Sequence, residues 1–464
     1  MTPRRQRPGA ILAGSVVAGI AVFASWLPVF GQEDSGGSTV TLGISTSLET
    51  SDNADLSLVS PGNTTQLNTT FTLGFESVTR SQALRFSVSD TLRNGDGPGS
   101  DSGLRGPDLF LSYGNQAANA RIDLSAQLTT RDVDGDPDEE ELDDPDALLV
   151  SDGTLSVLTL TAGLETGLEA PVGAFLSFSQ TSRDYSADAQ VRLDDNRRFG
   201  GSVGLILRPN DVTEARLSFG FDEFEEDDFA GTKRSTRSYN IDASRRLDPV
   251  TTIRAGVGWT EITEDFDDPT LESPDETGLT SVLGFERDLA AGSFSAELSR
   301  SVASNGGRTD LAATRIFALP SGSVELTLGA AKPAETGVQA VGRVAFSRAT
   351  NDQRLGLSLS SQVSVNNDSE VQRDTIADVS YDYRLNARGS LGLDLDYVQT
   401  SGLDGVGIID RTRITATANF RRELTADWTL STGLRHRVSR EEGLPDASSN
   451  TFFLTLGRDY SWRW

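Results

Sequence analysis

Apolar and polar residues alternate one by one along most of the chain that follows residue 40. From Leu67 to Phe75, for example, Leu, Thr or Phe stands at every odd position, and Asn, Thr or Gly stands between them. The stretches 253–259 and 391–397 alternate in the same way. Strict alternation indicates a β-strand with one apolar face, and no comparable stretch shows the 3.6-residue period of a helix. The sequence therefore predicts an all-β fold.

Two kinds of connection take turns between these segments. One kind is short and turn-like, as at 208–211 and 385–389, and the other is longer and acidic, as at 132–152, 222–234 and 261–277. Short turns at one end and long loops at the other are typical of outer-membrane barrels. Regularly spaced strands also suit a soluble sandwich or propeller. The strands, however, run about 10–13 residues, which exceeds the usual ~5–6 and matches a tilted membrane crossing.

The segments predict a transmembrane antiparallel up-and-down β-barrel of about 22 strands, within a range of about 18–24, and no plug domain. An even count places both chain ends on the side of the short turns. Barrels of this size usually have a plugged lumen, but the first strand begins almost at the start of the mature chain, which disfavours a TonB-type receptor. The lumen is then open, or partly filled by long side chains and folded-in loops, or the true number of strands is lower. The predicted strands are 40–50, 66–76, 83–93, 107–115, 120–131, 153–165, 173–183, 199–208, 212–221, 236–247, 251–261, 278–287, 293–303, 309–318, 323–332, 338–348, 354–365, 374–385, 390–399, 410–423, 428–439 and 450–464.

Residues 1–31 predict a secretion signal rather than a part of the fold. Arginines near the start precede an almost wholly apolar run at 10–26, and small residues follow up to Gly31. This is the order of a secretory signal peptide, with a single membrane anchor as the alternative. We therefore expect one outer-membrane barrel domain over 32–464, with short periplasmic turns and longer acidic extracellular loops.

Charge and composition exclude several classes of function. Asp and Glu number 68 against 41 Lys and Arg, which gives a formal net charge of −27 at pH 7. A polyanion of this kind repels nucleic-acid backbones and anionic membrane surfaces, which argues against both as partners. The chain has no Cys and one His, so disulfides, thiolate metal sites, Cys nucleophiles and His-based zinc clusters are excluded.

The chain ends inside a strand that carries alternating aromatic residues. Tyr460, Trp462 and Trp464 stand at every second position and share one face. The last strand thereby resembles that of bacterial outer-membrane β-barrels, which ends in an aromatic residue that the barrel-assembly machinery recognises. The turn units that begin at Arg245 and Arg421 resemble those of the β-barrel porin families.

This resemblance implies a location in the bacterial outer membrane after secretion across the inner membrane. It implies contact with outer-membrane lipid and lipopolysaccharide, and it makes the barrel-assembly machinery and periplasmic chaperones the expected partners. Small hydrophilic solutes are the expected cargo of such a barrel, and no nucleic acid is expected. The oligomeric state stays open, because no isolated apolar stripe marks a subunit interface.

Charged residues that the alternation places on the polar face are the candidates for a selective constriction. Rings of charge set the selectivity of pores. The alternative is that Arg and Asp pair across strands and only hydrate and stiffen a wet wall. The lumen-facing candidates are Arg216, Arg246, Arg254, Arg384, Arg421, Asp242, Asp378, Asp382, Asp394 and Asp396.

Asp132, Asp134, Asp136 and Asp138 place carboxylates at every second position of an acidic segment. Hard oxygen ligands bind Ca²⁺, so Ca²⁺ or Mg²⁺ at the acidic loops is the one cofactor that the sequence suggests. The alternative is a hydrated acidic loop at the cell surface. The only histidine, His436, falls on the lipid-facing side toward the loop end, which disfavours an outer-membrane hydrolase.

These features predict a porin-like channel without covalent chemistry. Small hydrophilic solutes or oligosaccharides would diffuse through a polar lumen lined by Arg and Asp. The acidic chain predicts a preference for cations. The alternative is a partner-dependent barrel in surface polysaccharide export or envelope scaffolding. An outer-membrane enzyme is the third and least favoured class.

Overall fold

The computed structural model describes residues 37–134, 148, 150–186, 193–271, 273, 275–334, 336–366, 370–403 and 409–464. The predicted signal at 1–31 lies outside these residues. Within the described ranges, every regular element is a β-strand. None of the chain that the structure describes forms a helix long and apolar enough to cross a membrane.

The wall of the molecule is a single closed sheet of long strands. Its first half consists of β1 (Gly37–Ser51), β2 (Thr64–Val78), β3 (Gln82–Asp96), β5 (Asp108–Gln116), β6 (Ala120–Asp134), β7 (Val150–Thr166), β8 (Val172–Tyr185), β9 (Asn196–Asn210), β10 (Thr213–Glu226), β11 (Lys233–Asp248) and β12 (Thr251–Asp265). Its second half consists of β13 (Asp275–Leu289), β14 (Gly292–Ala303), β15 (Gly306–Leu319), β16 (Gly322–Lys332), β17 (Gln339–Ala349), β18 (Gln353–Val365), β19 (Val371–Asn386), β20 (Gly389–Gly402), β21 (Arg411–Glu423), β22 (Trp428–Glu441) and β23 (Ala447–Arg463). The sequence did not predict the short β4 (Ser102–Leu104), which pairs with the end of β3.

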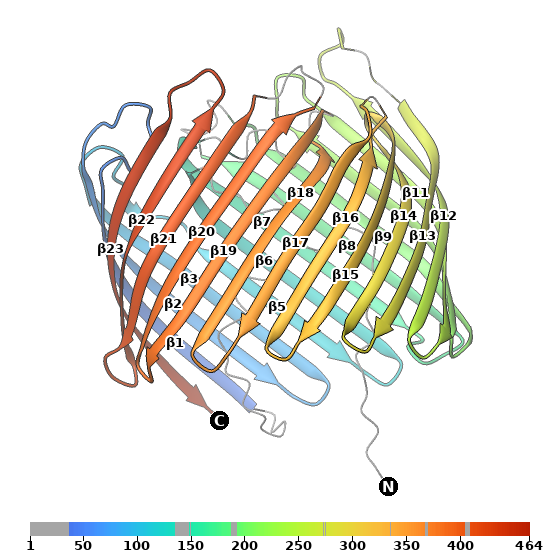
Figure 1. The fold of residues 1–464 in the computed structure, drawn as a ribbon, viewed down its shortest axis with the longest axis horizontal. Coiled ribbons are helices and arrows are strands. Elements are labelled where there is room, and N and C mark those ends of the chain that lie inside the picture. The colour runs from blue at the N-terminus through green and yellow to red at the C-terminus, as the bar shows by residue number, and fades with distance from the viewer. Residues whose placement is uncertain are drawn as a thin grey trace.

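Each strand of the wall pairs antiparallel with its neighbour in sequence, and β1 pairs with β23 to close the barrel (Figure 1). At this seam the amide of Ser38 donates to the carbonyl of Trp464 at 3.0 Å, and the amide of Trp464 donates back at 3.0 Å. Closure leaves no free edge in the wall, which is the condition for a sheet to stand in hydrocarbon. The predicted antiparallel barrel of about 22 strands is confirmed, because the described residues form 23 strands, of which all but β4 belong to the wall.

Short turns gather at one end of the barrel, where the last strand also ends, and the longer connections gather at the other (Figure 1). The acidic loops are shorter than predicted, because pairing continues into them: β6, β10 and β12 extend to Asp134, Glu226 and Asp265. Charged residues that suggested a loop stand opposite partners of the other sign. Glu225 opposes Lys233 on the neighbouring strand, and such pairs stabilise a sheet.

The two faces of the wall differ in polarity. Leu217, Ile241 and Val257 lie side by side on neighbouring strands and project outward, where each is exposed. Alternation then turns the polar residues between them into the barrel. The apolar surface is therefore on the outside, as a lipid-facing barrel requires.

Candidate functional site: a polar lumen covered at one end

The strand register places all ten predicted charged residues on the inward face, because each stands one position away from an outward apolar neighbour. They do not form a ring. The first three arginines lie on the adjacent strands β10, β11 and β12, and the other two lie on β19 and β21, across the barrel. The inward set is Arg216, Arg246, Arg254, Arg384, Arg421, Asp242, Asp378, Asp382, Asp394 and Asp396.

Arginines on the β9–β12 side of the lumen are paired with acids or with the backbone. Arg216 Nε lies 2.8 Å from the Glu214 carboxylate, which also pairs with Arg208 at 3.1 Å. Arg254 pairs with Glu297 of β14, and Arg246 donates to the carbonyl of Asp211 at 2.7 Å. Arg208 and Arg254 thus pair with acids of other strands, as in the cross-strand alternative, whereas Arg216 pairs within β10 and Arg246 bonds to the backbone.

The inward faces of β19 and β20 carry a cluster of acids. Asp378 stands directly opposite Asp396, and Asp382 and Asp394 occupy diagonal positions beside them. Like charges directly opposite each other are unfavourable in a sheet, and Arg354 of β18 stands opposite Asp382. The hydroxyl of Ser358 donates to Asp378 at 2.6 Å. We call these four carboxylates the acidic patch.

Toward the loop end, the same inward faces are buried. Gln372 is 0 %, Asp374 1 % and Ile376 4 % exposed, whereas Asp382 and Asp394 near the turns are exposed. The buried carboxylate of Asp374 nevertheless has hydrogen-bond donors around it. It accepts hydrogen bonds from the Ser364 hydroxyl (2.7 Å), the Thr400 hydroxyl (3.1 Å) and the Gln372 amide (3.1 Å). The lumen is therefore wet at its turn end and covered at its loop end along β19 and β20.

Leu148 provides part of this cover. It lies two residues before β7 and packs against Ile376 and Val398, and its carbonyl accepts from Arg413 Nη2 at 3.5 Å. Eight strands separate β7 from β20 along the shorter way around the wall, namely β21, β22, β23, β1, β2, β3, β5 and β6. The chain beside β7 thus contacts the far wall, and we call the packing of Leu148 on Ile376 and Val398 the cover contact.

The connection between β1 and β2 also turns inward. The side-chain Nδ2 of Asn53 donates to the backbone carbonyls of Ser57 at 2.8 Å and of Ser448 at 3.0 Å. Arg437, on the inward face of β22, donates to the carbonyl of Ala54 at 2.8 Å. Leu56 is 5 % exposed and has a φ of 48°, a conformation that a non-glycine residue rarely adopts. Packing holds this backbone strain in place.

Of the four predicted metal ligands, only Asp132 has a side chain that the structure describes. Asp132 receives two hydrogen bonds of 2.8 Å from the guanidinium of Arg93, which also pairs with Asp101 at 2.9 Å. The side chain of Asp134, and the whole of Asp136 and Asp138, lie outside the described residues. Among the residues that are described, no group of three acids or histidines is placed to hold a metal ion.

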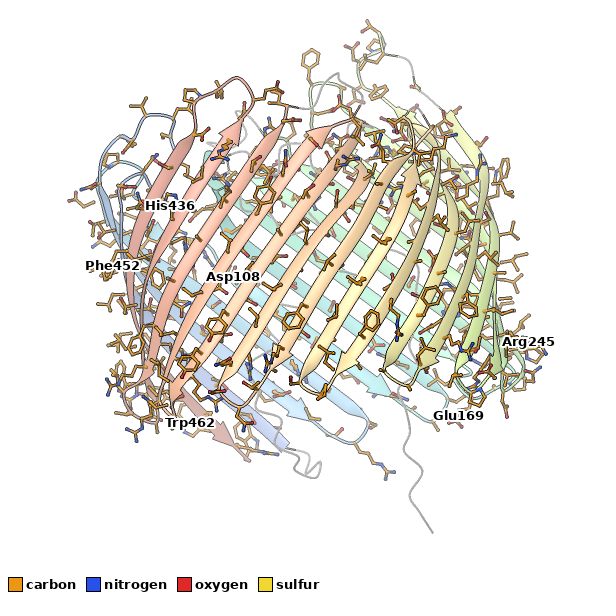
Figure 2. The ribbon with its side chains drawn as sticks, in the orientation of Figure 1. Asp108, Glu169, Arg245, His436, Phe452 and Trp462 are labelled. Carbon is orange, nitrogen blue, oxygen red and sulfur yellow. The ribbon has the colours of Figure 1, made fainter. Side chains whose placement is uncertain are left out.

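His436 takes part in a polar chain on the outward face near the loop end (Figure 2). Asn450 donates from its amide to Asp52 at 2.7 Å, so its carbonyl oxygen must accept from His436 Nδ1 at 2.9 Å. The backbone amide of Asn450 also donates to Asp52 at 2.7 Å. These two donors lower the pKa of Asp52 below its ordinary value.

The charge of Asp52 should therefore persist in mild acid. A lowered pKa stabilises the folded state above the ordinary Asp pKa, and this contribution is lost as the pH falls through the lowered value. We expect the Asn450 amide signal in an NMR titration to move with a midpoint below about 3.9, the pKa of a free Asp. In Asp52→Ala the Asn450 titration should disappear. A midpoint at or above the ordinary value would contradict the hydrogen bonds.

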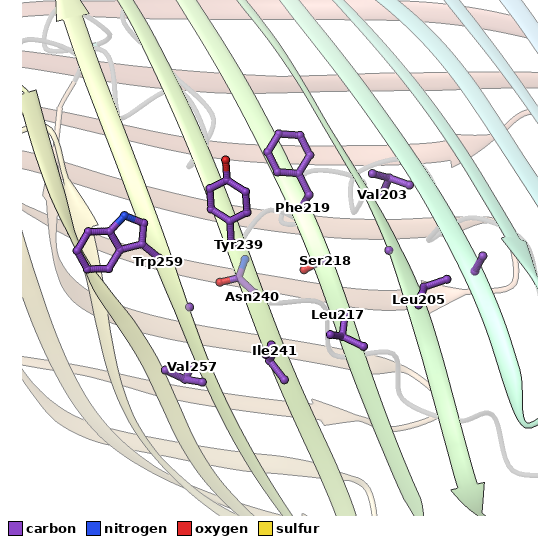
Figure 3. A pocket seen from close by; sticks show the side chains of 13 residues that line it. Val203, Leu205, Leu217, Ser218, Phe219, Tyr239, Asn240, Ile241, Val257 and Trp259 are labelled. Atoms are coloured by element: carbon purple, nitrogen blue, oxygen red, sulfur yellow. The ribbon is translucent and has the colours of Figure 1, made fainter.

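An apolar depression of about 620 Å³ lies on the outside of β9–β12 (Figure 3). Phe219, Tyr239 and Trp259 stand side by side along its upper edge, and Leu217 and Ile241 lie below them. Because its apolar side chains point outward, the depression is not part of the polar lumen. It belongs to the surface that meets hydrocarbon in a membrane barrel.

The C-terminal aromatic residues project outward at the turn end. Tyr460 and Trp462 stack with ring centroids 6.1 Å apart. Arg458 lies over Tyr460 at 4.3 Å and over Trp428 at 5.2 Å. Trp464 is exposed beyond them and holds the seam through its backbone. The strand that was predicted as an assembly signal is thus the last strand of the closed wall.

No protein-family model matches the sequence, and a search of curated proteins finds no relative. Solved structures match the fold. The copper transporter OprC is 12% identical over 92% of this chain and 80% of its own, with a TM-score of 0.54. The ferric-catecholate import receptor Fiu from E. coli K12 is 11% identical over 92% and 82%, with a TM-score of 0.59. The FrpB iron transporter from Neisseria meningitidis (F5-1 variant) is 10% identical over 93% and 83%, with a TM-score of 0.57.

These proteins are transporters and receptors, and at such identities the likeness is one of fold alone. The closed 22-strand barrel of this chain is similar in fold to these outer-membrane transporters and receptors. No separate plug domain occurs among the described residues of this chain. The cover at the loop end is built instead from segments next to the wall strands.

Proposed function

We propose that this protein is a channel of the bacterial outer membrane that admits small hydrophilic solutes, prefers cations and rests in a covered state. One observation carries the proposal. The inward face of β19 and β20 passes from the partly exposed acidic patch to a buried section under Leu148. We infer that this small apolar contact over a charged inward face serves to gate a pore.

A membrane location is supported by the closed wall and by the outward apolar residues. The likeness of the barrel to outer-membrane receptors and transporters points the same way. Short periplasmic turns, extracellular loops and insertion by the barrel-assembly machinery belong to this proposal.

The proposed passage of solutes needs no covalent step. Hydroxyl, amide and carboxylate groups of the wall replace part of the water around a polar solute. The acidic patch raises the local concentration of cations, against the charges of Arg354 opposite Asp382 and of the inward Arg384 and Arg421 nearer the turns. Lumen-wall carboxylates need no bound cofactor for this role, and Ca²⁺ or Mg²⁺ at the acidic loops stays a separate proposal.

A partner-gated barrel is the second candidate, and the cover contact is the observation that favours it. A lumen that is closed at rest suits a transporter that opens only when a partner or ligand displaces the cover. Export of a surface polysaccharide and uptake of a bound solute both belong to this class. The two candidates differ in whether the isolated protein opens by itself.

Single-channel recording of the refolded mature protein in a planar bilayer, with a salt gradient across it, tests the proposal. We expect discrete openings, and a reversal potential whose sign shows that cations permeate more readily than anions. A correctly folded barrel that remains silent would reject spontaneous opening and favour partner gating. A reversal potential of the opposite sign would reject the cation preference.

A further inference from the structure

The outward face of the wall is strongly asymmetric in charge at its turn end. In the half of each strand that adjoins the short turns, no Asp or Glu of the described wall occupies an outward position. Acidic residues outnumber basic ones by 68 to 41 in the whole chain, so an outward zone without any acid is the reverse of the overall charge balance. The outward charged residues there are all arginines, namely Arg245, Arg287, Arg315, Arg348, Arg422 and Arg458.

These arginines have a regular arrangement, and we call them the arginine arc. They lie on β11, β13, β15, β17, β21 and β23, the strands that run toward the short turns, and in the corresponding position β19 carries Tyr383 instead. The arc therefore follows one continuous side of the barrel from β11 to the seam. Figure 2 shows Arg245 and Trp462 at the turn-side rim.

Aromatic rings lie at the same level as the arc. The guanidinium of Arg315 lies 4.5 Å from the ring of Phe317, and that of Arg458 lies over Tyr460 and Trp428. Aromatic rings of membrane proteins concentrate at the level of the lipid headgroups. The arginines therefore stand where the hydrocarbon of a bilayer ends.

Several of the guanidinium groups have no partner within the described protein. Arg315 donates to the carbonyl of Ser293 at 2.9 Å, and Arg458 lies 3.8 Å from Asp427. Arg245, Arg348 and Arg422 are exposed. Across the described ranges, none of these last three makes a side-chain hydrogen bond or ion pair. Their charges are therefore available to a counterion from outside the chain.

A phosphate group at the edge of a hydrocarbon layer has the required chemistry. The guanidinium stays charged at any physiological pH and donates two parallel hydrogen bonds to phosphate oxygens. The outward apolar residues above the arc suit acyl chains. A second copy of this barrel would bring one arc against another, without acids at that level to neutralise either.

We propose that the arginine arc binds the phosphates of anionic phospholipids in the leaflet next to the short turns. This rests on the proposed membrane location and is independent of what the lumen conducts. Each arginine near an anionic surface contributes about 1 kcal/mol, which corresponds to about a fivefold preference at each position. The preference should follow the arc side of the barrel.

Tryptophan quenching by brominated lipids tests the proposal. The mature protein is reconstituted in phosphatidylcholine vesicles that contain an equal share of dibrominated phosphatidylglycerol or of dibrominated phosphatidylcholine. One variant retains Trp428, beside Arg458, as its only barrel tryptophan, and a second retains Trp259, far above the arc, with Phe at the other positions. We expect brominated phosphatidylglycerol to quench Trp428 more strongly than brominated phosphatidylcholine does, and to quench Trp259 equally.

Substitution of four arc residues should abolish this difference, and the variant is Arg245→Gln, Arg287→Gln, Arg348→Gln and Arg422→Gln. The matched control removes four positive charges that are outward at the loop end and should leave the difference at Trp428 unchanged. It is Lys233→Gln, Arg237→Gln, Arg300→Gln and Arg440→Gln. Equal quenching of wild-type Trp428 by both lipids, or a preference that survives the four substitutions, would overturn the proposal. Absence of quenching by either lipid would instead reject the membrane location.

Discussion

We expect the Leu148→Asp variant to open far more often than the wild-type barrel in a planar bilayer. Leu148 is 6 % exposed and packs on Ile376 and Val398. Burial of a leucine side chain stabilises a contact by about 1.5–3 kcal/mol, and a carboxylate has no favourable place between those two apolar residues. Each 1.4 kcal/mol is tenfold in population. The fraction of time in the open state should therefore rise by about tenfold to a hundredfold.

Leu271→Asp is the matched control, because it introduces the same charge in the connection between β12 and β13, where Leu271 is 45 % exposed. We expect it to behave like the wild type. The natural absence of cysteine also allows a reversible test. Leu148→Cys combined with Val398→Cys should close the barrel on oxidation and recover on reduction. Equal open probability in Leu148→Asp and the wild type would show that the cover contact does not gate the lumen.

The second large effect concerns ion selectivity. Replacing the four residues of the acidic patch with asparagine should reduce the ratio of cation to anion permeability by about fivefold to tenfold at 0.1 M salt. A unit charge about 4 Å from an ion contributes about 1 kcal/mol in water, and four such charges act together within a Debye length of about 10 Å. The effect should shrink at 1 M salt, where the Debye length is about 3 Å.

A control with the same change of net charge separates the lumen from the outer surface. Outward acids near the loop end of β10 and β12 supply it, and the substituted residues are Glu223, Glu225, Glu261 and Asp265. Their replacement by glutamine or asparagine should leave the reversal potential near that of the wild type. If both sets of substitutions shift it equally, the selectivity comes from the overall field of the protein and not from the patch.

The fold was largely predictable from the sequence because one property, the alternation of apolar residues, determines both the presence of a strand and its two faces. Each predicted strand coincides with a strand of the wall. The ends were less predictable. Pairs such as Glu225 with Lys233 extend the sheet by backbone hydrogen bonds and opposite charge, without apolar alternation. β4 was missed because three residues are too few to show a period.

The candidate site was predictable only as a list of inward residues. Alternation gives the face of a residue, but the register between strands decides its neighbours. The opposition of Asp378 and Asp396 follows from the pairing of β19 with β20. The cover contact left no signal at all, because Leu148 is one apolar residue in an acidic segment. Only the three-dimensional path of the chain brings it against Ile376 and Val398.

The seam between β1 and β23 has a consequence for how such a barrel is made. Every other pairing of the wall joins strands that follow each other in the chain, whereas the seam joins Ser38 to Trp464. Loop closure over that separation is slow compared with hairpin formation. Until the last strand is available, the nascent sheet has two open edges that could template aggregation. Assembly of the barrel thus depends on the order in which the strands pair, and the free edge of β1 has to be shielded until β23 can pair with it.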